Sequence, residues 1–68
     1  MKYSVNLRMK NPGPAKYLIE SCEVDNITNA FYAATNMITA NEGDHFVEII
    51  DNNTNEKVAG INEGESNV

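Results

Sequence analysis

The side chains that could serve as nucleophiles or as proton carriers are few in this chain of 68 residues, which contains one cysteine, Cys22, and one histidine, His45. Nucleophilic catalysis needs a nucleophile, a base and a third group that orients the base. One cysteine and one histidine do not make such a set. We expect Cys22 to pack within a strand as a small apolar residue and His45 to lie at the rim of a strand. The sequence therefore predicts no catalytic residue and no enzyme.

Metal chemistry has one candidate, a resemblance to a calcium-binding loop. Asp51, Asn53 and Asn55 match its first three ligand positions. The sixth position, however, holds Glu56 where the sharp turn requires glycine, and the twelfth holds Asn62 where a glutamate is required. No spacing of cysteine and histidine suits zinc, and no glycine-rich loop could hold a phosphate. We therefore expect a hairpin turn here, with no metal ion and no cofactor.

Carboxylates are the abundant functional groups, and they are unevenly distributed. From Glu20 onward the chain holds all ten of its acidic residues and one basic residue, Lys57, which is a net charge of −9. Phosphate contacts require Lys and Arg, so direct binding to nucleic acid is not expected. A negative surface instead attracts a strongly basic protein partner. The predicted partner-binding residues are, as first choice, Glu42, Asp44, Glu48, Asp51 and Glu56, and, as second choice, Glu20, Glu23 and Asp25.

Four strands and one helix are expected to position these groups. Residues 2–10 alternate apolar and polar side chains, which predicts a half-buried strand, and two prolines and a glycine in residues 11–14 predict a turn. Residues 15–24 form a second predicted strand with a bulge near Ser21. Residues 45–50 and 56–61 form two more strands, joined by a hairpin turn over residues 51–55.

The predicted helix covers residues 26–41, with Asp25 as its N-cap and Asn41 and Gly43 at its end. An apolar stripe at helical spacing should face the sheet. The stripe consists of Ile27, Ala30, Phe31, Ala34 and Ile38. The predicted fold class is therefore α+β, with ββαββ order and a four-stranded, mostly antiparallel sheet carrying one helix on one face. We expect one domain over residues 1–61 and a frayed acidic tail over residues 62–68.

The predicted helix carries no charged residue, which is unusual for a helix facing solvent. One interpretation is a tolerant surface with a bias towards Asn. The other is a seam between two copies of the chain through Tyr32 and Asn36, because interface cores lose charge and keep Tyr and Met. The sheet offers another seam, because its third strand is apolar on both faces. That seam would use Leu18, Phe46 and Ile50. Either seam predicts a homodimer, which would also stabilise a small core.

No signal peptide and no apolar stretch of membrane-spanning length is recognisable, and a lone thiol suits a reducing compartment. We therefore expect a cytoplasmic protein with no membrane partner.

The chain resembles the small acidic host-takeover proteins of lytic bacteriophages, among them early proteins of Bacillus phages that inhibit the nucleoid-associated protein HU. The likeness lies in its size, its ββαββ order, its acidic portion from Glu20 onward and segments such as FVEIIDNNTNEKVAG. It implies a dimer acting as a DNA mimic, which presents carboxylates where HU expects phosphates and so blocks DNA binding in the host bacterial cytoplasm. The basic residues from Lys2 to Lys16 depart from a uniformly acidic mimic.

Two other functions fit the sequence. One is a phage anti-defence protein or an inhibitor that binds RNA polymerase through an apolar sheet face. The other is a structural interaction domain.

Overall fold

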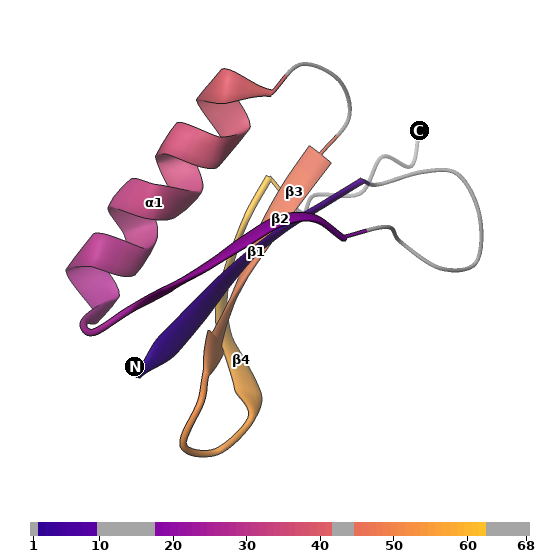
Figure 1. Ribbon diagram of the computed structural model, residues 1–68. Coiled ribbons are helices and arrows are strands. Elements are labelled where there is room, and N and C mark those ends of the chain that lie inside the picture. The colour runs from indigo at the N-terminus through magenta and orange to yellow at the C-terminus, as the bar shows by residue number, and fades with distance from the viewer. Residues whose placement is uncertain (1, 10–17, 42–44, 63–68) are drawn as a thin grey trace.

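The structure is a computed structural model that describes residues 2–9, 18–41 and 45–62. It contains a four-stranded sheet with one helix across one face (Figure 1). The elements in chain order are β1 (Tyr3–Met9), β2 (Leu18–Val24), α1 (Ile27–Ala40), β3 (His45–Asp51) and β4 (Glu56–Ile61). The strand order is β2-β1-β3-β4, and every neighbouring pair is antiparallel. The predicted α+β fold with ββαββ order is confirmed.

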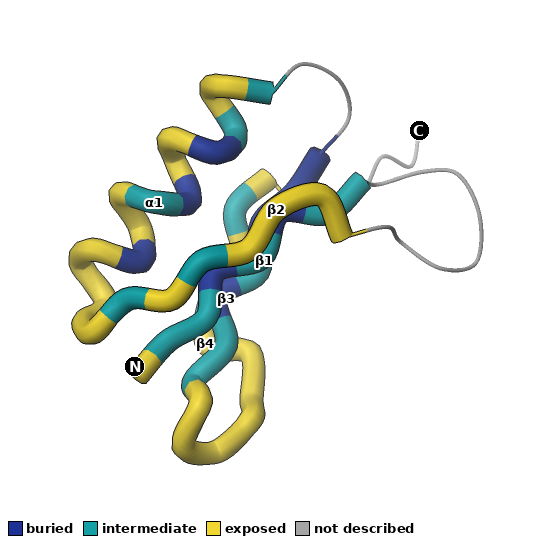
Figure 2. Tube along the Cα trace, in the orientation of Figure 1, coloured by how far each residue is buried: buried dark blue, intermediate teal, exposed yellow. Residues whose placement is uncertain are grey.

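The central strand β1 follows the alternation of its sequence. Val5 and Leu7 are fully buried on the face that α1 covers, whereas Asn6 and Arg8 lie on the outer face. The same alternation places Val47 and Ile49 of β3 beside them, because these residues pair with Leu7 and Val5. Figure 2 shows the buried segments gathered in β1, β3 and the sheet-facing side of α1.

A bulge in β2 differs in position from the predicted one. Leu7 pairs with Glu20 and Arg8 pairs with Leu18, so the extra residue is Ile19 and not Ser21. A one-residue shift moves the side chains that precede it to the other face of the sheet. Leu18, before the bulge, therefore lies on the outer face with Arg8. Cys22 and Glu20 come after the bulge and lie on the face that α1 covers, opposite Val5 and Leu7.

The helix begins one residue later than predicted, and its N-cap is Asn26, not Asp25. The Oδ1 of Asn26 accepts a hydrogen bond from the backbone N–H of Asn29 at 2.8 Å, which satisfies one of the free amides of the first turn. At the other end Asn41 is the C-cap, as expected, and its side-chain amide donates to the carbonyl of Met37 at 2.9 Å. The predicted end signal at Gly43 lies outside the described residues.

The face that α1 buries is rotated from the predicted stripe. Its buried residues are Ala30, Ala34 and Met37, whereas Ile27 and Phe31 are 38% and 41% exposed. Small alanine side chains let the helix lie close to the sheet, so the larger residues of the stripe are left at its flank. Met37, which the predicted stripe does not include, also belongs to the core.

The turn between β3 and β4 has the expected hairpin geometry. Asn55 has a φ of 65°, in the left-handed region that Asn tolerates, and its N–H donates to the carbonyl of Asp51 at 2.7 Å. A carboxylate oxygen of Asp51 accepts from the N–H of Asn53 at 2.8 Å. The predicted hairpin turn is therefore present, and the carboxylate of Asp51 stabilises it.

The outer face of the sheet is mainly polar over the described strands. At its centre the Nε of Arg8 donates to the carboxylate of Glu48 at 2.8 Å. Beside this pair, the hydroxyl of Ser21 donates to the Oδ1 of Asn6 at 2.7 Å. Among the described residues, no helix has the length and apolar content needed to span a bilayer.

Candidate functional site

Three acidic residues lie on or directly after β2, which is an edge strand of the sheet that the structure describes. Glu20, Glu23 and Asp25 are all exposed. Glu20 faces the helix side, whereas Glu23 pairs with Ser4 on the outer face, so the two carboxylates lie on both sides of one edge. A strand rises about 3.3 Å per residue, so roughly 10 Å separates their positions along it. No ion pair joins these three acids to any residue that the structure describes.

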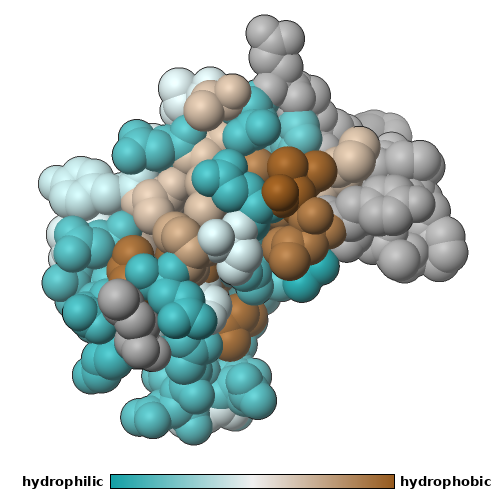
Figure 3. All heavy atoms as spheres, viewed as in Figure 1, coloured by the Kyte–Doolittle hydropathy of each residue, from teal (hydrophilic) through white to brown (hydrophobic). Residues whose placement is uncertain are grey.

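A groove of about 310 Å³ lies between this edge strand and the helix. Glu20 and Cys22 line it from β2, and the helix contributes residues at positions i, i+3, i+4 and i+7. These helix residues are Ala33, Asn36, Met37 and Ala40. The two alanines leave the groove open because they have no side chain beyond Cβ. Figure 3 shows this side of the molecule, where weakly apolar surface is bordered by hydrophilic side chains.

Cys22 lines this groove from β2. The side chain is partly buried and packs against the core cluster, as expected for a small apolar residue. Burial raises the pKa of the Cys22 thiol, and the negative charge of Glu20 raises this pKa further. A raised pKa keeps the thiol protonated near neutral pH, so Cys22 lacks the thiolate character of a reactive cysteine.

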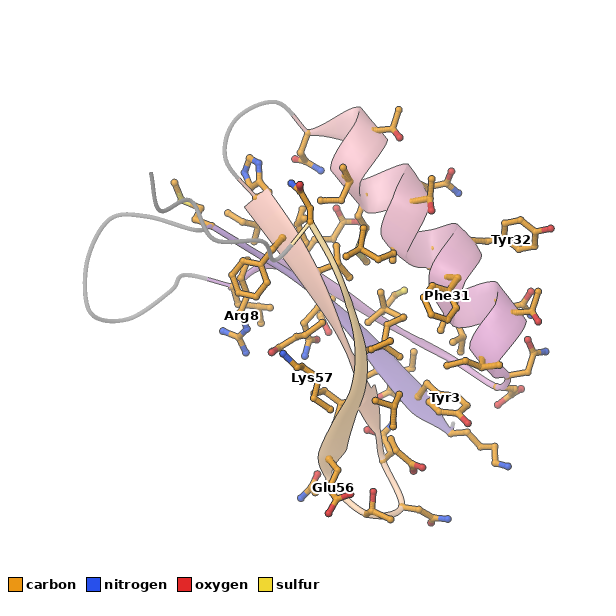
Figure 4. The ribbon with its side chains drawn as sticks, turned by 180° about the vertical axis from the view of Figure 1, so that it is seen from behind. Tyr3, Arg8, Phe31, Tyr32, Glu56 and Lys57 are labelled. Atoms are coloured by element: carbon orange, nitrogen blue, oxygen red, sulfur yellow. The ribbon has the colours of Figure 1, made fainter. Side chains whose placement is uncertain are left out.

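The first-choice acids predicted to bind a partner do not lie on one face. Glu48 is on the outer face, where its carboxylate pairs with Arg8. Asp51 lies on the opposite face of β3, and Glu56 is its partner on β4. Figure 4 shows Arg8 and Glu56 toward opposite ends of the sheet. Glu42 and Asp44 lie outside the described residues.

The residues predicted to form a dimer differ widely in exposure. Tyr32 is 67% exposed and points away from the sheet (Figure 4), and Leu18 is 51% exposed. Asn36 is exposed and lines the groove. In contrast, Phe46 is 9% exposed and Ile50 is partly buried, so the outer face of the sheet offers less apolar surface than the sequence indicated.

His45 is buried, whereas the sequence placed it at a rim. Its carbonyl accepts from the side-chain amide of Asn62 at 2.7 Å, and its Nδ1 has no hydrogen-bond partner among the described residues. Over the same part of the chain, no three side chains of His, Cys, Asp or Glu are grouped as metal ligands would be.

The groove was not predicted from the sequence, although some of the residues that line it follow a helical spacing. Ala33, Met37 and Ala40 are small or flexible residues at helical spacing, but only the packing against β2 shows that they border a space. Compared with known proteins, the chain matches no family model, and no curated protein or solved structure shows significant similarity to it.

Proposed function

We propose that the protein is a non-enzymatic bacteriophage inhibitor that acts as a DNA mimic in the host cytoplasm. Its partner is a basic nucleoid-associated protein of the HU class, whose DNA-contacting surface it occupies. One observation carries the proposal: Glu20, Glu23 and Asp25 are exposed on or directly after one edge strand and are paired with no described basic residue. HU-type proteins grip the DNA backbone through Lys and Arg with little reading of bases. A rival therefore needs negative charges held in fixed positions.

The backbone that carries these three acidic residues is ordered, which favours tight binding. Glu20 and Glu23 are part of a hydrogen-bonded strand, and Asp25 lies between that strand and the N-cap of the helix. An acidic segment without structure would lose more conformational entropy on binding. In this proposal β2 is therefore the first choice for the contact surface, ahead of the five acids that the sequence favoured.

The active form in this proposal is a homodimer joined through the outward face of α1. This face carries Tyr32, which is 67% exposed, and no charge, and Phe31 lies at its flank with 41% of its surface exposed. The buried core of a protomer is small, and a second copy would add apolar contacts. Two copies would also present two acidic edges to one basic partner.

The test is a titration in which the protein displaces DNA from HU at low and at moderate salt. The variant Glu20→Gln/Glu23→Gln/Asp25→Asn removes three charges from the β2 edge. Glu48→Gln/Asp51→Asn/Glu56→Gln removes three charges elsewhere and is the matched control. We expect the first variant to displace DNA about tenfold less well than the control, since each exposed pair contributes modestly. Displacement by the parent should weaken as salt rises.

Each outcome bears on a separate part of the proposal. A parent protein that never displaces DNA would show that HU is not the partner. Equal loss in the two triple variants would show that β2 is not the principal contact. Displacement that is insensitive to salt would favour an apolar mode of binding over mimicry of phosphate charge.

A further inference from the structure

We propose that the groove between β2 and α1 binds an arginine side chain of the basic partner. The inference rests on the proposed function for the identity of that partner, but the shape and chemistry of the groove support it separately. With about 310 Å³ the groove has the size of a small ligand pocket, and it lies directly beside the acidic edge.

The charge at the groove favours a cation. Glu20 lines the groove and has no ion-pair partner in the described part of the chain. Glu23 lies on the same strand and adds negative potential from the outer face.

The hydrogen-bonding groups favour arginine over lysine. A guanidinium group presents five N–H donors in a plane and can give two parallel hydrogen bonds to one carboxylate. Glu20 supplies that carboxylate, and the side-chain oxygen of Asn36 can accept a further hydrogen bond. The amide of Asn36 makes no hydrogen bond to any other described residue, so it is available. The ammonium group of lysine would satisfy these acceptors without the bidentate geometry.

The apolar residues that line the groove suit the methylene groups of the same arginine side chain. Ala33, Met37 and Cys22 give the groove apolar surface, and the protonated thiol adds no charge. Arginine buries its aliphatic stem on apolar surface while its head group stays polar, so both halves of the groove are used.

An arginine bound in the groove would also explain why the side of α1 that faces β2 carries no charge. A lysine at position 36 or 40 could reach Glu20 and fill the groove from within the chain. A glutamate there would repel Glu20. Alanine and asparagine at these positions leave the space open and leave the carboxylate for an external cation.

The test uses two blocked tripeptides, Gly-Arg-Gly and the same peptide with citrulline in place of arginine. Citrulline keeps the shape of the side chain but carries no charge. We expect the arginine peptide to shift the backbone amide NMR signals of Ala33, Asn36 and Ala40 in a saturable manner at low salt. The citrulline peptide should shift them far less, and Glu20→Gln should weaken the arginine peptide by about fivefold. Glu23→Gln, the matched control on the other face of β2, should weaken it by about twofold or less.

A second pair of variants changes the space in the groove and leaves the charge unchanged. Ala40→Leu should fill the groove and abolish the saturable shifts, whereas Thr35→Leu on the exposed outer side of α1 should leave them intact; circular dichroism checks that both variants fold. Equal shifts from the two peptides, or unchanged binding in Glu20→Gln and Ala40→Leu, would overturn the inference.

Failure of this inference is distinguishable from failure of the proposed function. If the arginine peptide binds the groove but the parent never displaces DNA from HU, the groove assignment stands and the HU assignment falls. If the parent displaces DNA and Ala40→Leu does so equally well, the groove is not used.

Discussion

At the scale of single residues, the bulge at Ile19 determines the environment of Glu20. Because the extra residue lies before Glu20, this side chain shares a face with Cys22 and borders the groove. The carboxylate therefore acts on the thiol, and the pKa of Cys22 is raised first by burial and second by Glu20. This link between the two residues can be measured without any partner.

Glu20→Gln should speed alkylation of Cys22 by iodoacetamide at pH 8. Removing the negative charge lowers the thiol pKa toward its usual value, so the thiolate fraction rises, and the thiolate is the reactive form. We expect a gain of roughly twofold, because burial, the larger cause, remains. Glu23→Gln on the outer face is the control and should change the rate little. A rate that responds equally to both variants would show that Glu20 does not act on the thiol.

The raised pKa of the Cys22 thiol also makes the free energy of unfolding depend on pH. Folding raises the pKa of the Cys22 thiol above its unfolded value of roughly 8.5. The contribution of the protonated thiol is therefore complete below that pH and is lost as the pH rises through the raised pKa. The loss of stability that comes from Cys22 therefore occurs in the alkaline range and not near neutral pH.

At the scale of elements, each face of the sheet has a separate role. Val5 and Leu7 of β1 contact α1, whereas Arg8 on the same strand pairs with Glu48 in water-accessible surroundings. The ion pair joins β1 to β3 at partial exposure, where such pairs contribute about 1 kcal/mol or less. Packing on the helix side is therefore the main source of stability in this sheet.

Leu7→Ala and Leu18→Ala make the same chemical change on the two faces. Leu7 is fully buried in the core cluster, so its truncation should lower the free energy of unfolding by about 3 kcal/mol. Leu18 is 51% exposed, so the same truncation should cost well under about 1 kcal/mol. Urea denaturation followed by circular dichroism measures both. Similar losses in the two variants would contradict the assignment of the faces.

At the scale of the whole molecule, exposed apolar side chains lie on β2 at Leu18 and Ile19 as well as on α1 at Phe31 and Tyr32. The exposed part of β2 also carries acidic residues, whereas α1 carries no charge. The uncharged helix would suit the proposed contact with a second copy, and the acidic strand would suit the proposed contact with a basic partner.

Tyr32→Glu should convert the dimer to a monomer at micromolar concentration. Tyr32 is the most exposed of the large apolar residues in the described ranges, and a charge there would have to be desolvated in the seam. Asn53→Glu in the hairpin turn adds the same charge away from the seam and should leave the dimer intact. Sedimentation equilibrium gives the masses. A monomeric parent would refute the dimer, and dissociation by Ile50→Glu alone would place the seam on the sheet.

The order and type of the elements were determined by the sequence itself, because they depend on local patterns. Alternation in β1 and the Asn-rich turn before Glu56 act within a few residues, and both were predicted correctly. The absence of charge in α1 was equally visible. Its buried stripe was misassigned, since a pattern with apolar residues at Ile27, Phe31 and Met37 does not by itself show which flank lies closest to the sheet.

Only the tertiary structure decided which acids share a surface. The bulge at Ile19 changes the face of the residues before it, and its place depends on pairing with β1 and not on β2 alone. Glu48 meets Arg8 from 40 positions away, so no local pattern could show that its charge is paired. The groove likewise exists only between two elements, because Ala33 and Ala40 become a boundary when α1 packs beside β2. Register and packing join residues that are distant in the chain, and such relations have no local signature in the sequence.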